Sequence, residues 1–467
     1  MHIEQIYTGC LAQGAYYIRS ENEAAIIDPL RETKPYTSRA EKDGVKIKYI
    51  FETHFHADFV SGHVDLAKKT GAKIIFGPNA STSYESYVAK DGEEFKIGKI
   101  TIKVLHTPGH TLESSTFLLL DENKKPHCIF SGDTLFIGDV GRPDLAIKSD
   151  LTQEDLAGML FDSLQTKIKT LPDDVIVYPA HGAGSACGKN MSKETFDSLG
   201  NQKQKNYALV INNKQDFIKE LTTGILPPPQ YFAKNAFLNK TGYDAFDVVI
   251  EKGYTALSPQ QVEDFANEAN AMILDVRKPQ EFAAGHIPNS IFIGIDGQFA
   301  PWVGALITDL KQPIILIAPS GREEEIITRL SRVGYDNCLG YLDGGIEAWK
   351  NAGKEISTIT SISAEEFSNR LKDNVRVLDV RKPGEYNNQH IENVPNQPLD
   401  YINEWTNNFD KNTEYYIHCA GGYRSMIAAS ILKARGYERL VDVAGGFSAI
   451  QKTNVPLTCE QTCSSSK

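Results

Sequence analysis

Residues 53–63 read THFHADFVSGH and directly follow the strand-like run KYIFE at 48–52. Short runs of this kind dominate the N-terminal half of the chain, and histidine or aspartate follows several of them. In layered α/β folds, active sites usually form at the ends of strands. The stretch therefore predicts a layered α/β domain with a functional site where its strands end.

Three further segments repeat this pattern of a strand followed by a turn that bears His or Asp. They read TPGHT at 107–111, SGDT at 131–134 and YPAHG at 178–182. Imidazole and carboxylate groups suit iron, zinc or manganese. Four such segments in order indicate a metal site. The isolated His63, His106 and His127 are interpreted as ordinary surface or core groups.

The four segments together resemble the metallo-β-lactamase superfamily. That resemblance implies an αββα sandwich with the metal at the sheet edge. The two-metal form of the family motif reads HxHxDH, whereas Phe59 stands at the last position here. A phenyl ring cannot bind a metal, and its bulk takes up space near the second metal position. The sequence therefore favours one metal over two.

Longer segments, among them SGDTLFIGDVGRPDL at 131–145 and YPAHGAGSACGKN at 178–190, resemble the persulfide dioxygenases. These enzymes use a single ferrous iron held by two His and one Asp. The resemblance implies one Fe(II) per chain, held by His54, His110 and Asp133. Such a facial set leaves positions open for a substrate sulfur and for O₂.

The same resemblance places other residues near the metal. It implies that His56, Asp58 and His181 orient the metal ligands or iron-bound water. Arg142 aligns with a family arginine close to the site, and an ion pair to Asp144 is its equally weighted structural alternative.

The segment after His181 departs from the glutathione-type members, because Gly-Ala-Gly-Ser stands where they carry an aromatic residue. The thiol that carries the persulfide therefore stays open between glutathione, coenzyme A and another small thiol. Cys187, in the same turn, is interpreted as structural.

The rest of the chain contains an internal repeat. MILDVRKPQEFAAGHIPN, starting at Met272, recurs as VLDVRKPGEYNNQHIEN, starting at Val377. This indicates two copies of one domain of roughly 100 residues, longer than a solenoid repeat. Each copy has a helix-start signal and then strands alternating with helices, which predicts a parallel α/β sheet. The start signals are SPQQ at 258–261 and SAEE at 363–366, and the strands are 271–276 and 313–318, then 376–380 and 415–418.

In the second copy, the strand at 415–418 leads into Cys419-Ala-Gly-Gly-Tyr-Arg-Ser and then a helix. We expect loop N–H groups and the helix N-terminus to face the sulfur and to stabilise a nucleophilic thiolate. Gly421, Gly422 and Tyr423 form the expected anion cradle. Arg424 is expected to hold an oxyanion such as sulfite or thiosulfate.

Both copies resemble the rhodanese family, which implies sulfur transfer at Cys419. The Cys-to-Arg spacing is shorter than in related phosphatase-type domains. Asp379 and Arg381 are interpreted mainly as a structural ion pair. The first copy reads PSGRE at 319–323 without a cysteine, so we expect it to be silent and to space, orient or dimerise the working parts. Cys459 and Cys463 are interpreted as incidental thiols of a flexible tail.

Composition limits the setting. The 467 residues carry a net charge of −11, which argues against nucleic acid as the main partner. No apolar run approaches the ~20 residues of a membrane span, and the N-terminus lacks signal-peptide features. The seven cysteines are scattered, as in a reducing compartment, so we expect a cytoplasmic protein. The expected domains are 1–253, 254–358 and 359–467.

Together these features predict a persulfide dioxygenase, converting a small persulfide, O₂ and water to thiol and sulfite, coupled to sulfur transfer at Cys419. The alternative is a two-zinc thioester hydrolase of the glyoxalase II type with an accessory sulfur-carrier module. A non-catalytic scaffold with a vestigial metal domain is a further alternative. We expect a homo-oligomer, as is common in these families. The direction of sulfur transfer stays open.

Overall fold

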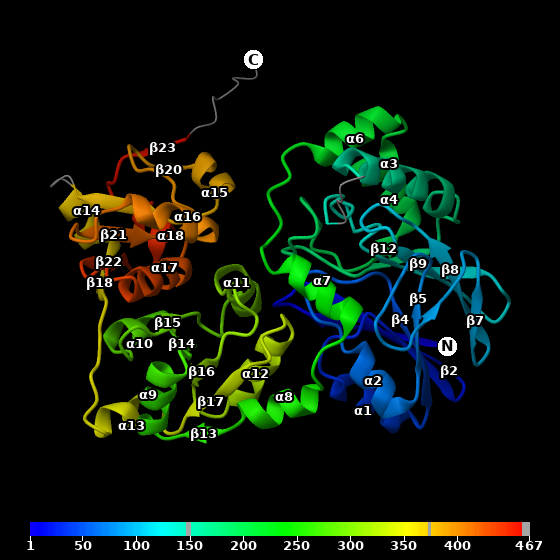
Figure 1. The fold of residues 1–467 in the computed structure, drawn as a ribbon. Coiled ribbons are helices and arrows are strands. Elements are labelled where there is room, and N and C mark those ends of the chain that lie inside the picture. The colour runs from blue at the N-terminus through cyan, green and yellow to red at the C-terminus, as the bar shows by residue number, and fades with distance from the viewer. Residues whose placement is uncertain (146–150, 372–374, 460–467) are drawn as a thin grey trace, which may run out of the picture. The chain divides into compact units, whose positions relative to one another are not determined.

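The computed structural model describes residues 1–145, 151–371 and 375–459 (Figure 1). The chain divides into two compact units, one formed by Met1–Val248 with Thr328–Gly334 and the other by Val249–Ile327 with Tyr335–Lys467. Each unit has its own sheets and its own apolar clusters.

The first unit is a sandwich of two six-stranded sheets. In spatial order, the first sheet contains β1 (His2–Thr8), β2 (Gln13–Ser20), β3 (Glu23–Ile27), β4 (Lys46–Glu52), β5 (Lys73–Phe76) and β6 (Tyr87–Val88). The second contains β12 (Asp197–Ser198), β11 (Ile176–Pro179), β10 (Pro126–Gly132), β9 (Ser115–Leu120), β8 (Ile100–His106) and β7 (Glu94–Ile97).

Apolar side chains fill the space between the two sheets. Phe51 of the first sheet and Phe117 of the second pack with ring centroids 4.9 Å apart in this core. Strand β9 is buried at all six positions, as its unbroken run STFLLL requires when a sheet is covered on both faces.

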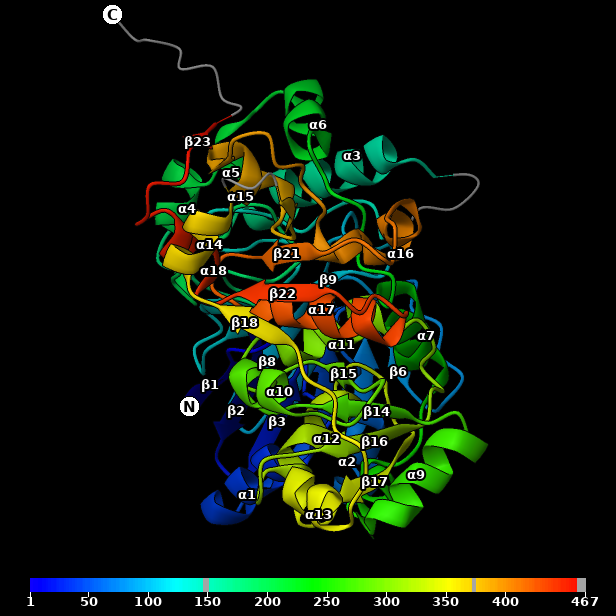
Figure 2. The same ribbon diagram turned by 90° about the vertical axis from the view of Figure 1, so that its left-hand side faces the viewer.

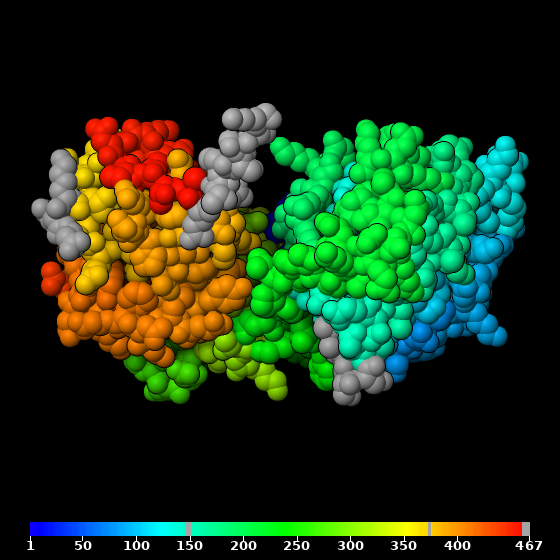
Figure 3. Space-filling model, turned by 90° about the horizontal axis from the view of Figure 1, so that it is seen from above, coloured from blue at the N-terminus to red at the C-terminus, as the bar shows by residue number. Residues whose placement is uncertain are grey.

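Helices cover the outer faces of the sandwich. Those against the first sheet are α1 (Lys34–Asp43) and α2 (His63–Thr70). Those on the side of the second sheet are α3 (Gln153–Ser163), α4 (Leu199–Lys205), α5 (Tyr207–Val210) and α6 (Lys214–Thr222). In the space-filling view the green atoms of the region that includes α6 lie against the teal atoms of the same unit (Figure 3). The predicted αββα arrangement is confirmed. Two more helices, α7 (Phe232–Thr241) and α8 (Phe246–Gly253), follow.

The second unit contains the two repeat copies, each with a parallel sheet. In spatial order the first copy has β13 (Ala256–Leu257), β17 (Cys338–Leu342), β16 (Ile314–Ile317), β14 (Met272–Asp275) and β15 (Ile291–Phe292). The second has β18 (Thr360–Ile362), β22 (Leu440–Val443), β21 (Tyr415–His418) and β19 (Arg376–Asp379). The pairings within these two sheets are parallel, as the repeat predicted.

The predicted helix starts hold in both copies. Ser258 accepts a hydrogen bond from the Gln261 N–H at the start of α9 (Pro259–Glu268), and Ser363 accepts one from the Glu366 N–H before α14 (Ala364–Arg370). The first copy also has α10 (Pro279–Ala284), α11 (Phe299–Leu306), α12 (Glu323–Ser331) and α13 (Gly345–Asn351). The second has α15 (Pro383–Asn388), α16 (Ile402–Trp405), α17 (Tyr423–Ala434) and α18 (Gly446–Ile450), with the small pair β20 (His390–Ile391) and β23 (Leu457–Thr458).

Helix α17 joins the two copies. It contacts β21 and β22 of its own sheet and also β15 and α10 of the first copy (Figure 2). The helix that starts at the cysteine loop is therefore packed on both sides. Within the described residues, no helix is long and apolar enough to cross a membrane.

Gly132, at the end of β10, gives a test of how the two sheets fit together. Its φ is +53°, and a Cβ there would lie 2.6 Å from the Thr53 side chain. The left-handed conformation alone costs a non-glycine residue about 1–2 kcal/mol. We expect Gly132→Ala to lower the first unit's Tm by about 2–8 °C, as measured by thermal unfolding.

The matched control for this substitution is Gly9→Ala. No atom lies within 4 Å of the Cβ that it adds. A Gly132→Ala protein as stable as the control would contradict the fit described for this turn.

Candidate metal centre and cysteine loop

The metal-centre residues lie on loops that leave four strands of the sandwich. His54 follows β4, His110 follows β8, Asp133 follows β10 and His181 follows β11. All four side chains are buried. The loops come from both sheets, so closing the sandwich is what brings these side chains together.

His54, His110 and Asp133 offer ligand atoms that all lie within 4.8 Å of one another. The Asp133 Oδ2 is 3.4 Å from the His110 Nε2 and 3.8 Å from the His54 Nε2. The His110 Nε2 and the Asp133 Oδ2 have no hydrogen-bond partner among the described residues. Because burying unpaired polar atoms is costly, this donor set fits a bound cation.

Hydrogen bonds on the far side of each histidine fix its orientation. The His110 Nδ1 lies 2.8 Å from the Arg142 carbonyl oxygen, which accepts its proton. The His54 Nδ1 lies 3.0 Å from the Thr53 Oγ1, which itself donates to the Asp28 Oδ2. Both Nε2 lone pairs are thereby directed at the centre.

The protonation states of the ligand residues also suit a bound metal. Burial, and then the neighbouring His56, hold the pKa of His54 well below its ordinary value. Burial alone would raise the pKa of Asp133. The surrounding histidines, His181 most strongly, lower it by more than burial raises it, so the pKa lies well below its usual range. Neutral imidazole and ionised carboxylate are the forms that bind a divalent cation.

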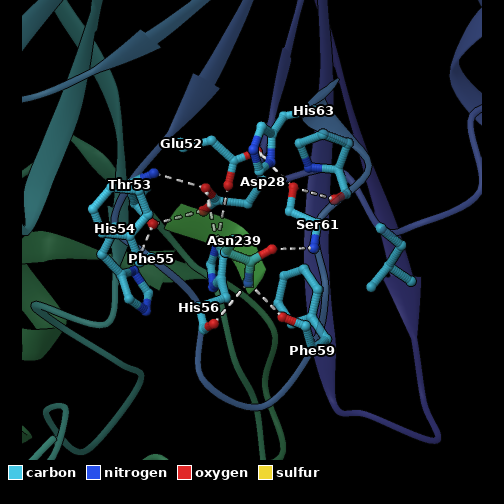
Figure 4. A network of polar contacts seen from close by, with 12 residues as sticks. Asp28, Glu52, Thr53, His54, Phe55, His56, Phe59, Ser61, His63 and Asn239 are labelled. Carbon is cyan, nitrogen blue, oxygen red and sulfur yellow. Dashed lines mark hydrogen bonds and ion pairs between the residues drawn. The ribbon is translucent and has the colours of Figure 1, made fainter. Parts of the chain in front are cut away.

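The ring of His56 lies beside that of His54, with centroids 4.2 Å apart, and points toward Asp28 (Figure 4). Its Nε2 lies 3.1 Å from the Asp28 Oδ1, and its ring stacks on Phe59 with centroids 4.3 Å apart. The Asn239 Nδ2 donates to the carbonyl oxygens of both His56 and Phe59, at 2.7 Å each. The ligand atom of His56 groups with those of Asp28 and Glu52, all within 4.8 Å of one another.

His181 links two carboxylates. Its Nδ1 is 2.8 Å from the Asp133 Oδ1 and its Nε2 is 2.8 Å from the Asp58 Oδ2. Burial lowers the pKa of His181, but the two aspartates raise it well above its ordinary value overall. His181 therefore orients Asp133 by a charged hydrogen bond.

Cys187 also belongs to this region, which its sequence context did not indicate. Its sulfur and the ligand atoms of Asp58 and His181 lie within 4.8 Å of one another. Burial raises the pKa of the thiol well above its ordinary value, so the sulfur is protonated. The glycine-rich turn after His181 was the only signal available in the sequence.

The Arg142 side chain makes the ion pair that the sequence offered as one of its two alternatives. Its guanidinium makes a two-pronged ion pair with Asp144, at 2.6 Å and 2.7 Å. Its backbone carbonyl, not its side chain, holds His110. Arg142 therefore orients His110 through its main-chain carbonyl and not through its guanidinium. His63 is a buried histidine whose Nε2 lies 2.6 Å from the Tyr84 hydroxyl, whereas its Nδ1 has no hydrogen-bond partner among the described residues.

Cys419 lies buried at the end of β21, in the loop that precedes α17. The Gly422 N–H donates to the Cys419 Sγ at 3.1 Å, and glycine is required there because φ is +99°. The thiol lies 3.7 Å from the Ser425 hydroxyl, which donates to the Asp442 Oδ1 at 2.7 Å. The loop thus surrounds the sulfur with oriented polar groups.

The other residues expected around the anion make contacts away from the Cys419 sulfur or are exposed. Gly421 is exposed. The Arg424 guanidinium forms a two-pronged ion pair with Glu385, at 2.5 Å and 2.7 Å. The hydroxyl of Tyr423 donates to the Gly294 carbonyl oxygen of the first copy, at 2.6 Å.

Ion pairs brace the loops of both repeat copies. Arg381 pairs with Asp379 at 2.6 Å, as interpreted from the sequence. In the first copy, Arg322 pairs with Asp296 and Glu325, and the loop contains no cysteine. Cys459 is exposed, and Cys463 lies outside the described residues.

Family models match most of the chain. Residues 8–181 match the metallo-beta-lactamase superfamily, and residues 258–352 and 363–453 each match the rhodanese-like domain. A crystal structure of a metallo-beta-lactamase from Staphylococcus aureus subsp. aureus COL is 34% identical, with a TM-score of 0.64. The match covers 73% of this chain and 98% of that one.

Curated relatives have two different activities in their names. The human mitochondrial persulfide dioxygenase ETHE1 is 29% identical over 214 residues, 45% of this chain and 76% of that protein. A probable hydroxyacylglutathione hydrolase, glo2, of Schizosaccharomyces pombe is 35% identical over 161 residues. That match covers 34% of this chain and 58% of the yeast protein.

The cysteine loop predicts a pH dependence of stability. Burial raises the pKa of Asp442 to about 6. Because the folded state binds this proton more tightly, the group stabilises the fold below about pH 4, and that gain is lost as the pH rises through about 6. We expect Asp442→Asn to remove up to about 3 kcal/mol of this dependence, as measured by the unfolding of the second unit between pH 4 and 7.

The exposed Asp400→Asn serves as the control for this measurement. An Asp442→Asn protein with the same pH slope as the wild type would contradict the assignment.

Proposed function

Because this chain belongs to the metallo-β-lactamase superfamily and carries two rhodanese-like domains, we propose that it is a persulfide dioxygenase joined to a sulfurtransferase. The proposed domains are 1–253, 254–358 and 359–467. The metal centre oxidises the terminal sulfur of a small thiol persulfide, and Cys419 transfers sulfane sulfur.

The observation that carries this proposal is Phe59 beside a three-residue ligand set. Phe59 occupies the last position of the motif and stacks on His56, which faces Asp28. Asp58 and His181 are paired with each other. These features favour one metal over the two zincs of the alternative, a thioester hydrolase of the kind that the yeast relative's name describes.

A ferrous ion held by His54, His110 and Asp133 would supply adjacent open positions for a persulfide sulfur and O₂. The overall reaction is RSSH + O₂ + H₂O → RSH + SO₃²⁻ + 2H⁺, in which the terminal sulfur is oxidised and O₂ is reduced. The protein's part is orientation: Thr53 and the Arg142 carbonyl hold the imidazoles, and His181 holds Asp133.

At Cys419 the proposed step exchanges a sulfur atom between two carriers. The thiolate attacks the outer sulfur of thiosulfate, the S–S bond of thiosulfate breaks, and sulfite leaves with that bond's electron pair. A persulfide remains on Cys419, and the step is reversible. Sulfite is thus a product of the metal centre and also a reactant or product at Cys419, which gives the fusion a chemical reason.

Metal analysis tests the choice between the two functions. We expect about one iron per chain in the purified protein and no gain in metal when zinc is added. Phe59→His restores the missing ligand type, so this variant should bind a second metal when zinc is supplied.

Phe55→His is the matched control, because Phe55 is in the same loop but packs against Phe76 at 4.8 Å. Two zincs per chain in the wild-type protein would overturn the dioxygenase proposal.

Separate sites predict separable activities. Asp133→Ala should reduce O₂ uptake with glutathione persulfide by more than about 100-fold, beyond the cost of losing a residue that only orients a ligand. The same variant should keep sulfur transfer from thiosulfate to cyanide. Cys419→Ser should do the reverse and let sulfite accumulate. Equal loss of both activities in either variant would argue against two sites.

A further inference from the structure

A chain of buried polar side chains leads away from the sulfur of Cys419. The Cys419 thiol donates to the Ser425 hydroxyl at 3.7 Å, and that hydroxyl donates to the Asp442 Oδ1 at 2.7 Å. The Ser361 hydroxyl donates to the other carboxylate oxygen at 3.1 Å. Cys419 is 1% exposed, and Ser425 and Asp442 are fully buried. The chain thus connects the sulfur to a carboxylate that solvent does not reach.

The surroundings of Asp442 contain hydroxyl groups and no cation. In the sheet it lies between Ile417 of β21 and Ser361 of β18. Among the described residues, its side chain is paired with the hydroxyls of Ser361 and Ser425 and with no cation. Burial without a cation disfavours the charged form of a carboxyl group. It raises the pKa of Asp442 to about 6, so this group can take up and release a proton near neutral pH.

The other titratable groups around the cysteine loop are engaged elsewhere. Arg424 pairs with Glu385 at 2.5 Å. The His418 Nε2 lies 3.8 Å from the Asp379 Oδ2, which pairs with Arg381. The hydrogen-bond chain that starts at the sulfur therefore ends on one carboxylate with no charged partner.

The first copy allows an internal comparison, because its sheet has the same register. The chain in the second copy uses three positions, held by Ser361, Asp442 and Ser425. In the first copy the same three places hold Ala256, Tyr341 and Glu323. The copy without the cysteine therefore also lacks the serine–aspartate pair.

We propose that Asp442, acting through Ser425, holds the proton that the Cys419 thiol releases. The S–H proton passes to the Ser425 oxygen as that hydroxyl passes its own proton to the Asp442 Oδ1. One S–H bond breaks and one O–H bond forms on the carboxylate, so a single negative charge moves from Asp442 to the sulfur. The Ser425 hydroxyl then donates to the thiolate. Ser425 touches the reacting atom, whereas Asp442 is a positioning residue that acts through it.

The exchange suits a nucleophile that is almost fully buried, because no proton has to leave for solvent. Asp442 keeps the proton while the sulfur of Cys419 carries the transferred sulfur atom. It returns the proton when that atom has passed to an acceptor and the thiolate forms again. This inference rests on the proposed sulfur transfer at Cys419 and adds the group that activates its nucleophile.

The pH profile of Cys419 alkylation tests the proton holder without requiring sulfur transfer. The full chain is treated with iodoacetamide, a small neutral reagent, from about pH 5 to 9, and the alkylated Cys419 peptide is quantified by mass spectrometry. Two coupled groups lose their protons in two macroscopic steps. In the wild type we therefore expect the rate to rise in two steps, with the lower one near pH 6.

Two substitutions should remove the lower step. Asp442→Asn keeps the size of the side chain but cannot take up a proton, so one step should remain. Ser425→Ala breaks the chain and should also leave one step. Its rate at pH 7 should fall by about tenfold, at the low end for the loss of a hydrogen bond to a charged group. Ser425→Thr retains the hydroxyl and should keep both steps.

Glu438→Gln is the matched control, because Glu438 is an exposed acid just before β22, and it should keep both steps. Circular dichroism at each pH checks that every variant is folded.

A wild-type profile with a single step, or an Asp442→Asn profile that keeps the step near pH 6, would overturn the proposal. Loss of this step in Asp442→Asn but not in Ser425→Ala would overturn the route through Ser425. Absence of thiosulfate transfer in the wild type would instead contradict the proposed function, while the alkylation profile would still decide whether Asp442 holds the proton.

Discussion

The buried carboxylate of Asp133 is the constraint on which the metal centre depends. One of its oxygens is held by His181, and the other faces His54 and His110. A carboxylate this deep in the protein is stable only when its charge is compensated. The protonated His181, on a loop of the same sheet as Asp133, supplies this compensation, and closing the sandwich adds the imidazole of His54 from the other sheet. The Gly132 turn immediately before Asp133 is part of the same requirement, because it lets β10 pass close to Thr53.

The fold could be predicted from the sequence alone. The sequence also indicated the ligand set, which stays a prediction. Strands and turns are set by local sequence patterns, and the internal repeat shows which segments correspond in the two copies. The predicted strand 415–418 therefore coincides with β21. Contacts that depend on the main chain or on distant segments could not be predicted. The hydrogen bond from His110 to the Arg142 carbonyl cannot be predicted from a pattern of side chains. The Cys187 thiol lies near Asp58 because of the conformation of the turn that carries it, which the sequence does not specify.

The two repeat copies show how one scaffold supports different roles. In both, an Asp–Arg pair braces the first loop, at 2.6 Å in each case. In the second copy the next loop presents a cysteine to a glycine N–H. The corresponding loop of the first copy contains no cysteine, and its Arg322, the counterpart of Arg424, pairs with Asp296 and Glu325. The loop of the first copy is thus neutralised by its own acids, whereas that of the second keeps a polar environment around sulfur.

At Gly297 the backbone of the first copy approaches the ring of Tyr423 so closely that a Cβ there would lie 2.5 Å from the ring carbon Cζ. A single added methyl group would displace either this backbone or the ring. The two copies therefore cannot be redesigned one at a time, because a change in the backbone of the copy without the cysteine would shift the segment that follows Cys419 in the other.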